Sequence, residues 1–121
     1  MYFYHEAKNN KCNKYKSKKV QVDGITFDSK KESIRYKELK LLLQAGVISD
    51  LELQPVFELQ PKFKKNGKTI RAIKYVADFM YYDNEKKKVV IEDTKGFETK
   101  DFKLKKKMFE YKYLDYELTI L

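Results

Sequence analysis

The sequence predicts an α/β protein in which helices pack on a mixed central sheet, preceded by a short N-terminal β-hairpin. Three observations support this fold class. A helix-type segment with clear start and stop signals occupies residues 29–46, three β-type segments follow it, and a second helix-type segment leads into a short apolar strand. The resulting α-β-β-β-α-β order is typical of a sandwich around a mixed sheet.

The first elements can be assigned from local signals. Residues 20–27 alternate apolar and polar side chains on either side of Asp23-Gly24, which is the pattern of a two-residue β-hairpin. The helix is predicted to begin after Ser29, whose spacing to Glu32 is that of a capping box, and to end at Gly46 as its C-cap.

The three β-type segments come next. Residues 51–59 alternate well enough for a strand, although Pro55 indicates that part of it lies at an edge or a bulge. A hairpin turn is predicted at Asn66-Gly67. Residues 70–82 and 88–95 then form two strands that are joined by the polar turn DNEKKK.

The C-terminal part is predicted as a helix followed by a strand. A helix over residues 100–113 would place Phe102, Phe109 and Tyr113 on one side and most of its lysines near the other. Residues 116–121 read YELTIL, a short apolar strand. No Gly-, Ser- or Pro-rich linker divides the sequence between these elements, so we expect one domain over residues 20–121.

The composition favours a compact domain with a polyanionic partner. The chain has 121 residues, of which 42% are hydrophobic and 15% aromatic, enough for one modest core. Lys and Arg number 27 against 18 Asp and Glu, so the formal net charge is +9. This excess suits nucleic acid, although charge alone does not separate DNA from RNA. Residues 1–19 are interpreted as a basic, flexible arm, with a solvated tail as the alternative.

Cysteine and histidine are too scarce for several classes of site. The single Cys12 and the single His5 exclude an internal disulfide framework and a Cys/His zinc site, so any metal has to be held by oxygen. No apolar run approaches the roughly 18 residues of a membrane span, and the N-terminus lacks the apolar core of a signal peptide. We therefore expect a cytoplasmic protein.

The candidate chemistry lies on the last two β-type segments before the second helix. Side chains in a strand alternate faces, so Asp93 and Lys95 point one way while Glu92 points the other. A turn centred between Glu85 and Lys86 would place Asp78 directly opposite Asp93, roughly 5 Å apart at Cβ. Two carboxylates that close repel unless a proton or a cation lies between them, and a hard divalent ion is the natural resident. Separate surface acids on an edge hairpin are the alternative.

Glu32 has two explanations. It is accounted for as the capping-box glutamate of the first helix. It also continues the helical stripe of Tyr36, Leu39 and Leu43 toward the core, where a carboxylate would suggest a ligand. Both roles are compatible with each other.

Several further residues are candidates for contact with nucleic acid. Gln54 could bring an amide near a metal or a phosphate, or be an ordinary strand residue. Lysines on the two helices could contact phosphates or only solvate a helix face; they are Lys30, Lys31, Lys103, Lys106 and Lys107.

Together these residues resemble the PD-(D/E)XK nuclease superfamily. Glu32, the Asp78 of VADF and the Asp93-Thr94-Lys95 of EDTKG match its three motif elements in order, and the resemblance covers about Phe27 to Leu121. Ala77 replaces the proline of the motif, and the second acid is Asp, both of which vary in the superfamily. The segments VDGITFDSKKESIRYKEL, LELQP, YVADF and VIEDTKG more closely resemble a family of small phage-encoded proteins. The motif plan is similar to that of the transposon-end endonuclease TnsA and of archaeal Holliday-junction resolvases.

The resemblance implies a restriction-endonuclease-like fold and a metal-dependent DNA endonuclease. Asp78 and Asp93 would hold Mg²⁺ or Mn²⁺, with the Thr94 backbone carbonyl, and Glu32 would bind a second ion or a metal-bound water. Lys95 would position the attacking hydroxide or stabilise charge. The expected substrate is branched or otherwise structured DNA in phage replication or recombination, in the cytoplasm of an infected or prophage-carrying host. A homodimer and a phage replication or recombination protein are expected as partners.

Two other function classes stay open. The first is a non-catalytic nucleic-acid-binding module, which would leave unexplained why aspartates face a phosphate backbone. The second is a structural phage protein, which explains neither strand aspartate.

Overall fold

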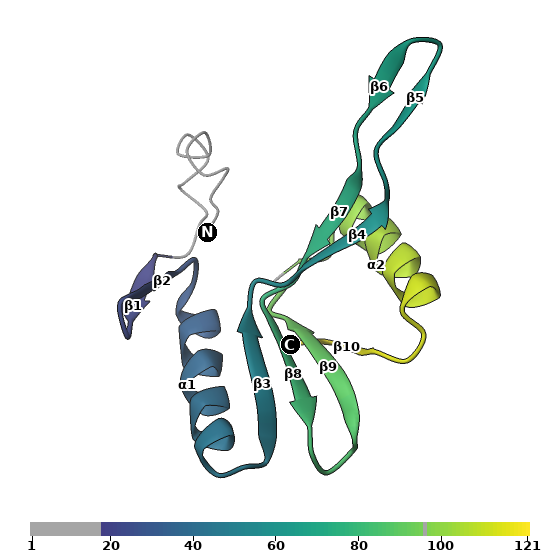
Figure 1. Cartoon of the computed structure of the whole chain (residues 1–121). Helices are drawn as coiled ribbons and strands as arrows, with labels where there is room; N and C mark the ends of the chain where they lie inside the picture. Colours follow the sequence, from purple (N-terminus) through teal and green to yellow (C-terminus); the bar gives the residue numbers. More distant parts are fainter. Residues whose placement is uncertain (1–17, 96) are drawn as a thin grey trace. The chain divides into compact units, whose positions relative to one another are not determined.

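The computed structural model describes residues 18–95 and 97–121 (Figure 1). The chain divides into two compact units, the first reaching to Leu41 and the second comprising Leu42–Leu121. Residues 1–17 of the predicted basic arm, with His5 and Cys12, lie outside the described residues. The single domain over residues 20–121 stays a prediction.

The first unit contains the expected hairpin and helix. Strands β1 (Val20–Val22) and β2 (Ile25–Phe27) pair antiparallel, and both turn residues between them, Asp23 and Gly24, have positive φ. Helix α1 (Lys30–Gln44) begins after Ser29, whose Oγ accepts a hydrogen bond from the Glu32 amide at 3.1 Å. The predicted hairpin and the start of the predicted helix are therefore confirmed.

The end of helix α1 also agrees with the sequence. Gly46 has a φ of 78°, and its amide bonds to the Leu43 carbonyl while the Val47 amide bonds to that of Leu42. These contacts satisfy carbonyls that the last turn of a helix leaves without partners, and the left-handed conformation suits glycine.

The second unit is built around a mixed four-stranded sheet in the order β10-β9-β8-β3. The strands are β3 (Ile48–Leu53), β8 (Phe79–Asp83), β9 (Lys88–Asp93) and β10 (Glu117–Ile120). Strands β9 and β10 are parallel, and the other two pairings are antiparallel. The protein is therefore a mixed α/β protein with a mixed sheet, as predicted.

Two of the predicted strands are interrupted in the structure. The segment 51–59 is divided at Gln54-Pro55 into β3 and β4 (Val56–Gln60). The segment 70–82 is divided into the end of β6 (Lys68–Ile70), β7 (Ile73–Val76) and β8. The prediction of a continuous strand is wrong for both segments. In the first, Gln54 has a φ of 50° and Pro55 has no amide hydrogen to give to a ladder.

The interruptions produce a bent antiparallel ribbon. Strand β3 pairs with β8, and beyond the bend β4 pairs with β7. Backbone hydrogen bonds continue across the bend, from the Gln54 amide to the Asp78 carbonyl at 2.9 Å and from the Ala77 amide to the Pro55 carbonyl at 3.1 Å. The ribbon therefore changes direction at Asp78 without losing its pairing.

The ribbon ends in a second hairpin, made by β5 (Phe63–Lys65) and β6. The predicted turn at Asn66-Gly67 is confirmed, with positive φ at both residues. In Figure 1 this hairpin continues beyond β4 and β7 as a separate two-stranded projection. All residues from 61 to 70 are exposed.

Helix α2 (Lys100–Lys112) packs on β4 and β7 and supplies much of the core. Its N-cap is Thr99, whose Oγ1 accepts a hydrogen bond from the Phe102 amide at 3.1 Å. The Phe109 ring is fully buried and lies 4.9 Å from Phe57 and 5.0 Å from Tyr113, centroid to centroid. The predicted helix and its apolar side are confirmed.

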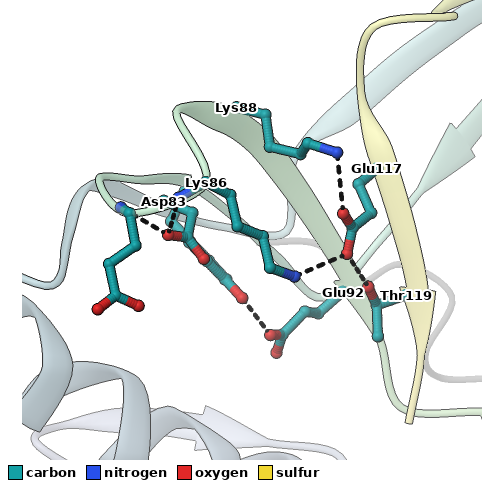
Figure 2. Close-up of polar contacts among 8 residues, drawn as sticks. Asp83, Lys86, Lys88, Glu92, Glu117 and Thr119 are labelled. Atoms are coloured by element: carbon teal, nitrogen blue, oxygen red, sulfur yellow. Dashed lines mark hydrogen bonds and ion pairs between the residues drawn. The ribbon is translucent and has the colours of Figure 1, made fainter.

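Strand β10 is held to the sheet by side chains as well as by the ladder. Glu117, at the start of the strand, forms ion pairs with Lys86 and Lys88, each at 3.4 Å, and accepts a hydrogen bond from Thr119 (Figure 2). These lysines lower the pKa of Glu117, although burial acts in the opposite direction. None of the helices in the described part of the chain is long and apolar enough to cross a membrane.

Candidate active site

The pairing of β8 and β9 brings two aspartates together at one end of the sheet. Phe79 is paired with Glu92, and the Asp78 amide donates to the Glu92 carbonyl at 3.0 Å. Asp78 and Asp93 thus occupy neighbouring positions at the bend, in the register that the turn predicts. The Asp78 carboxyl group is one of the causes of the raised pKa of Asp93.

Asp78 is oriented by the residue that follows Asp93. The amide and the hydroxyl of Thr94 both donate to Asp78 Oδ2, each at 2.7 Å. Two donors on one oxygen fix the carboxylate in a single orientation. Thr94 was predicted to act through its carbonyl, and the contacts found here are made by its amide and its side chain.

Asp93 is buried, with 3% of its surface exposed, and it accepts a hydrogen bond from the Tyr75 hydroxyl at 2.6 Å. Lys95 Nζ lies 3.9 Å from the same Oδ2 atom and 4.8 Å from the centre of the Phe102 ring. Burial and the neighbouring Asp78 raise the pKa of Asp93 to about 7, against the opposite effects of Lys95 and Tyr75. The site is therefore poised to hold either a proton or a cation.

The donor set of this pair fits a magnesium ion. In residues 18–95 and 97–121 no group of three or more Asp, Glu, His or Cys side chains is arranged to hold a metal. Mg²⁺ commonly binds through one or two carboxylates, with water and substrate phosphates as its other ligands. The hydrogen bonds and the ion pair described above are all made to the Oδ2 atoms of the two aspartates.

Gln54 approaches this site through its backbone. Its amide donates to the Asp78 carbonyl, and its left-handed φ forms part of the bend that presents Asp78. The structure therefore places Gln54 beside Asp78, whereas its predicted contact with nucleic acid stays a prediction.

Glu92 lies on the opposite face of β9 from Asp93. It is 2% exposed and accepts a hydrogen bond from the Tyr81 hydroxyl at 2.5 Å (Figure 2). Strand alternation thus separates the two acids as expected.

The predicted residues of the first helix belong to the first compact unit. Glu32 is buried in the first turn of α1, and its amide donates to Ser29 Oγ, so Ser29 caps the helix. Lys30 and Lys31 are exposed on the same turn. The roles of these residues toward metal and nucleic acid stay predictions.

The predicted lysines of the second helix lie on its solvent side. Lys103 and Lys107 are exposed, and Lys106 is half-buried. Their placement is compatible with contact to phosphates and equally with solvation of the helix face.

Two side chains at the site were not predicted from the sequence. Tyr75, which bonds to Asp93, reads as an ordinary core aromatic three residues before Asp78. The hydroxyl of Thr94 was the second. The sequence did offer a sign of this contact, because Thr94 is a hydrogen-bonding residue directly after Asp93. At the end of a strand such a side chain can turn toward a residue of the adjacent strand.

Fold and site together define a mixed α/β protein with a carboxylate pair and a lysine at the end of two adjacent sheet strands. The chain belongs to the family described as "Protein of unknown function (DUF1064)", whose model matches residues 12–121. Comparisons with curated proteins and with solved structures gave no match.

Proposed function

We propose that this protein is a Mg²⁺- or Mn²⁺-dependent endonuclease that hydrolyses phosphodiester bonds in DNA. The observation that carries the proposal is the buried Asp93 beside Asp78 and Lys95 at the end of two adjacent strands. The resemblance to the PD-(D/E)XK superfamily and the net charge of +9 also support it.

Asp78 and Asp93 would hold the metal, with the Thr94 carbonyl as a further oxygen and Glu32 as the predicted additional ligand. When bound, such an ion lowers the pKa of a coordinated water and neutralises charge on the phosphate. Two close carboxylates provide the local negative charge that a divalent ion requires.

The remaining residues of the site act on these ligands or on the phosphate. Thr94 holds the Asp78 carboxylate in place, and Tyr75 does the same for Asp93. Lys95 has a partly exposed ammonium group beside Asp93, so it can contact a phosphate oxygen or orient the nucleophile while it remains paired.

The biological substrate that we propose is branched or otherwise structured DNA in phage replication or recombination. A homodimer would allow paired strands to be cut together.

The proposal can be tested by incubating the purified protein with supercoiled, linear and four-way-junction DNA. We expect cleavage with Mg²⁺ or Mn²⁺ and none with EDTA, with the junction cut fastest. Cleavage that persists in EDTA would contradict the metal dependence. Faster cleavage of matched RNA would change the proposed substrate class.

Variants test which side chains carry the reaction. Asp78→Ala and Lys95→Ala should each lower the cleavage rate by about 10²–10³-fold or more while the protein still binds DNA. Asp115→Ala and Lys87→Ala, at exposed positions, are controls for the loss of one acid and one lysine. Full activity in both site variants would refute the mechanism.

Glu32 requires a separate variant because it also occupies the capping-box position in the first turn of helix α1. Glu32→Gln keeps a side chain that can serve a capping box but loses the charge. If Glu32 is a ligand, this variant should need a higher Mg²⁺ concentration for half-maximal cleavage. An unchanged Mg²⁺ dependence would leave capping as its function.

A non-catalytic nucleic-acid-binding module is the second candidate. It is favoured by the formal net charge of +9. Tight binding of DNA without cleavage of any substrate, in either metal, would select this function.

A further inference from the structure

The hairpin at the far end of the bent ribbon carries a concentration of positive charge. Between residues 61 and 74 the sequence has six cations and no acidic residue; the cations are Lys62, Lys64, Lys65, Lys68, Arg71 and Lys74. None of these six forms an ion pair with another residue of the described chain. Like charges this close repel one another and favour binding of a polyanion.

The register of the hairpin separates its two faces. Phe63 is paired with Ile70, and Lys65 is paired with Lys68 on the same face. Lys64 is paired with Thr69 on the other face, which we call the basic face. Continuing the alternation by one pair adds Lys62 and Arg71 to the basic face. Both line one surface hollow together with Glu58, Ala72 and Lys74, so three of its five lining residues are cations.

The hairpin contributes little to the core. Every residue from 61 to 70 is exposed, including Phe63 at 42% and Ile70 at 40%. The hairpin extends beyond the elements that pack on α2 (Figure 1). An exposed ribbon of this kind can enter a groove, since the major groove of B-DNA admits a two-stranded β-ribbon.

We propose that the β5–β6 hairpin is an arm that binds the phosphate backbone of duplex DNA. The choice of DNA as the partner rests on the proposed nuclease function. The positive charge and the exposure of the hairpin are observed independently of that function. A duplex is favoured over a single strand because single-strand sites stack bases on several aromatic rings, and the hairpin offers Phe63 alone. The six cations of residues 61–74 would be attracted to a polymer that carries about one negative charge per 1.7 Å of axis.

Binding to a fluorescent duplex across a range of salt concentrations tests the arm. The parent protein is Asp93→Asn in EDTA, so that cleavage does not interfere. Lys64→Gln with Arg71→Gln removes two cations of the basic face. The control, Lys37→Gln with Lys87→Gln, makes the same change in net charge at exposed positions outside the arm.

Each phosphate contact contributes about 0.9 to the slope of log K against log salt, so the arm variant should lower the slope by about 1.8. We expect its affinity at moderate salt to fall by at least about tenfold, with a much smaller change in the control. Circular dichroism of both variants should match the parent because the hairpin lies outside the core.

Several results would contradict the proposal that the hairpin binds duplex DNA. They are absence of duplex binding by the parent, equal losses in the two double variants, or an equal loss on anionic phospholipid vesicles. Tighter arm-dependent binding to single-stranded DNA or duplex RNA would replace the proposed partner.

The two proposals fail in different ways. If the arm variant lowers the salt slope but the wild-type protein cleaves no substrate, the proposed role of the arm stands and the nuclease proposal is refuted. If the wild-type protein cleaves DNA with metal but the arm variant leaves the salt slope unchanged, the nuclease proposal stands and the proposed role of the arm is refuted.

Discussion

The two ends of the β4–β7 ribbon differ in almost every physical property. At the bend, Asp78 and Asp93 form an acidic pair that is supported by hydroxyl groups and lies next to the aromatic core. At the other end, the β5–β6 hairpin is exposed, basic and outside that core. One continuous element therefore combines a buried, hydrogen-bonded acidic site with an exposed basic surface.

The difference follows from where helix α2 packs. It covers β4 and β7 and buries Phe57, Tyr75 and Phe109 between them, which holds Tyr75 against Asp93. Chemistry requires groups fixed within fractions of an ångström, whereas phosphate contacts tolerate movement. The packed end is therefore the one that we propose for reaction, and the exposed end the one that we propose for binding.

The largest effect is expected from removing the support under the bend. Phe109→Ala should lower the free energy of unfolding by about 3–5 kcal/mol because this ring is fully buried. Tyr111→Ala, on the same helix but 84% exposed, should change it by less than about 0.5 kcal/mol. Chemical denaturation measures both. Equal values would show that α2 does not support the ribbon through Phe109.

The raised pKa of Asp93 predicts how stability depends on pH in the metal-free protein. Between the ordinary value of 3.8 and the folded value of about 7, the folded state keeps a proton that the unfolded state has lost. Stability should therefore fall as pH rises from about 4 to about 7 and then level off, by up to about 4 kcal/mol.

Asp93→Asn isolates this contribution because it cannot titrate. The difference in unfolding free energy between wild type and variant should change across that pH window, and Mg²⁺ should stabilise wild type more at pH 8 than at pH 5. A difference that stays constant with pH would mean that Asp93 titrates normally.

A smaller effect is expected at the hydroxyl groups that bond to the two buried acids. Tyr75→Phe removes a donor that favours ionised Asp93, so the acidic limb of the cleavage profile should move up by about one pH unit. Tyr81→Phe removes the corresponding donor to Glu92 on the other face and is the matched control. A shift of the same size in both variants would indicate a general loss of packing.

The smallest effect is expected at the tip of the ribbon. Phe63→Ser should change the free energy of unfolding by less than about 0.5 kcal/mol, since the side chain is 42% exposed and lies on a hairpin without a core. Thermal unfolding provides the measurement. A decrease in the free energy of unfolding of more than about 2 kcal/mol would show that the hairpin is as important for stability as the packed end of the ribbon.

Local signals were sufficient to predict much of the candidate site. The polar turn after β8 and the alternation of β9 set the register that places Asp78 beside Asp93, because a short hairpin leaves few alternatives. The bend was less predictable. Pro55 indicated an irregularity, but the left-handed conformation of Gln54 and its bond to the Asp78 carbonyl depend on a strand far along the chain.

By itself, the sequence determined the two turns with Asp-Gly and Asn-Gly, the two helices with the caps of the first, and the faces to which Glu92 and Asp93 point. These depend on neighbouring residues and on the period of each element. Only the tertiary structure decided that Tyr75 bonds to Asp93, that Thr94 orients Asp78, and that the β5–β6 hairpin stands outside the core. The physical reason is that burial and long-range hydrogen bonds arise from packing between segments far apart in the chain.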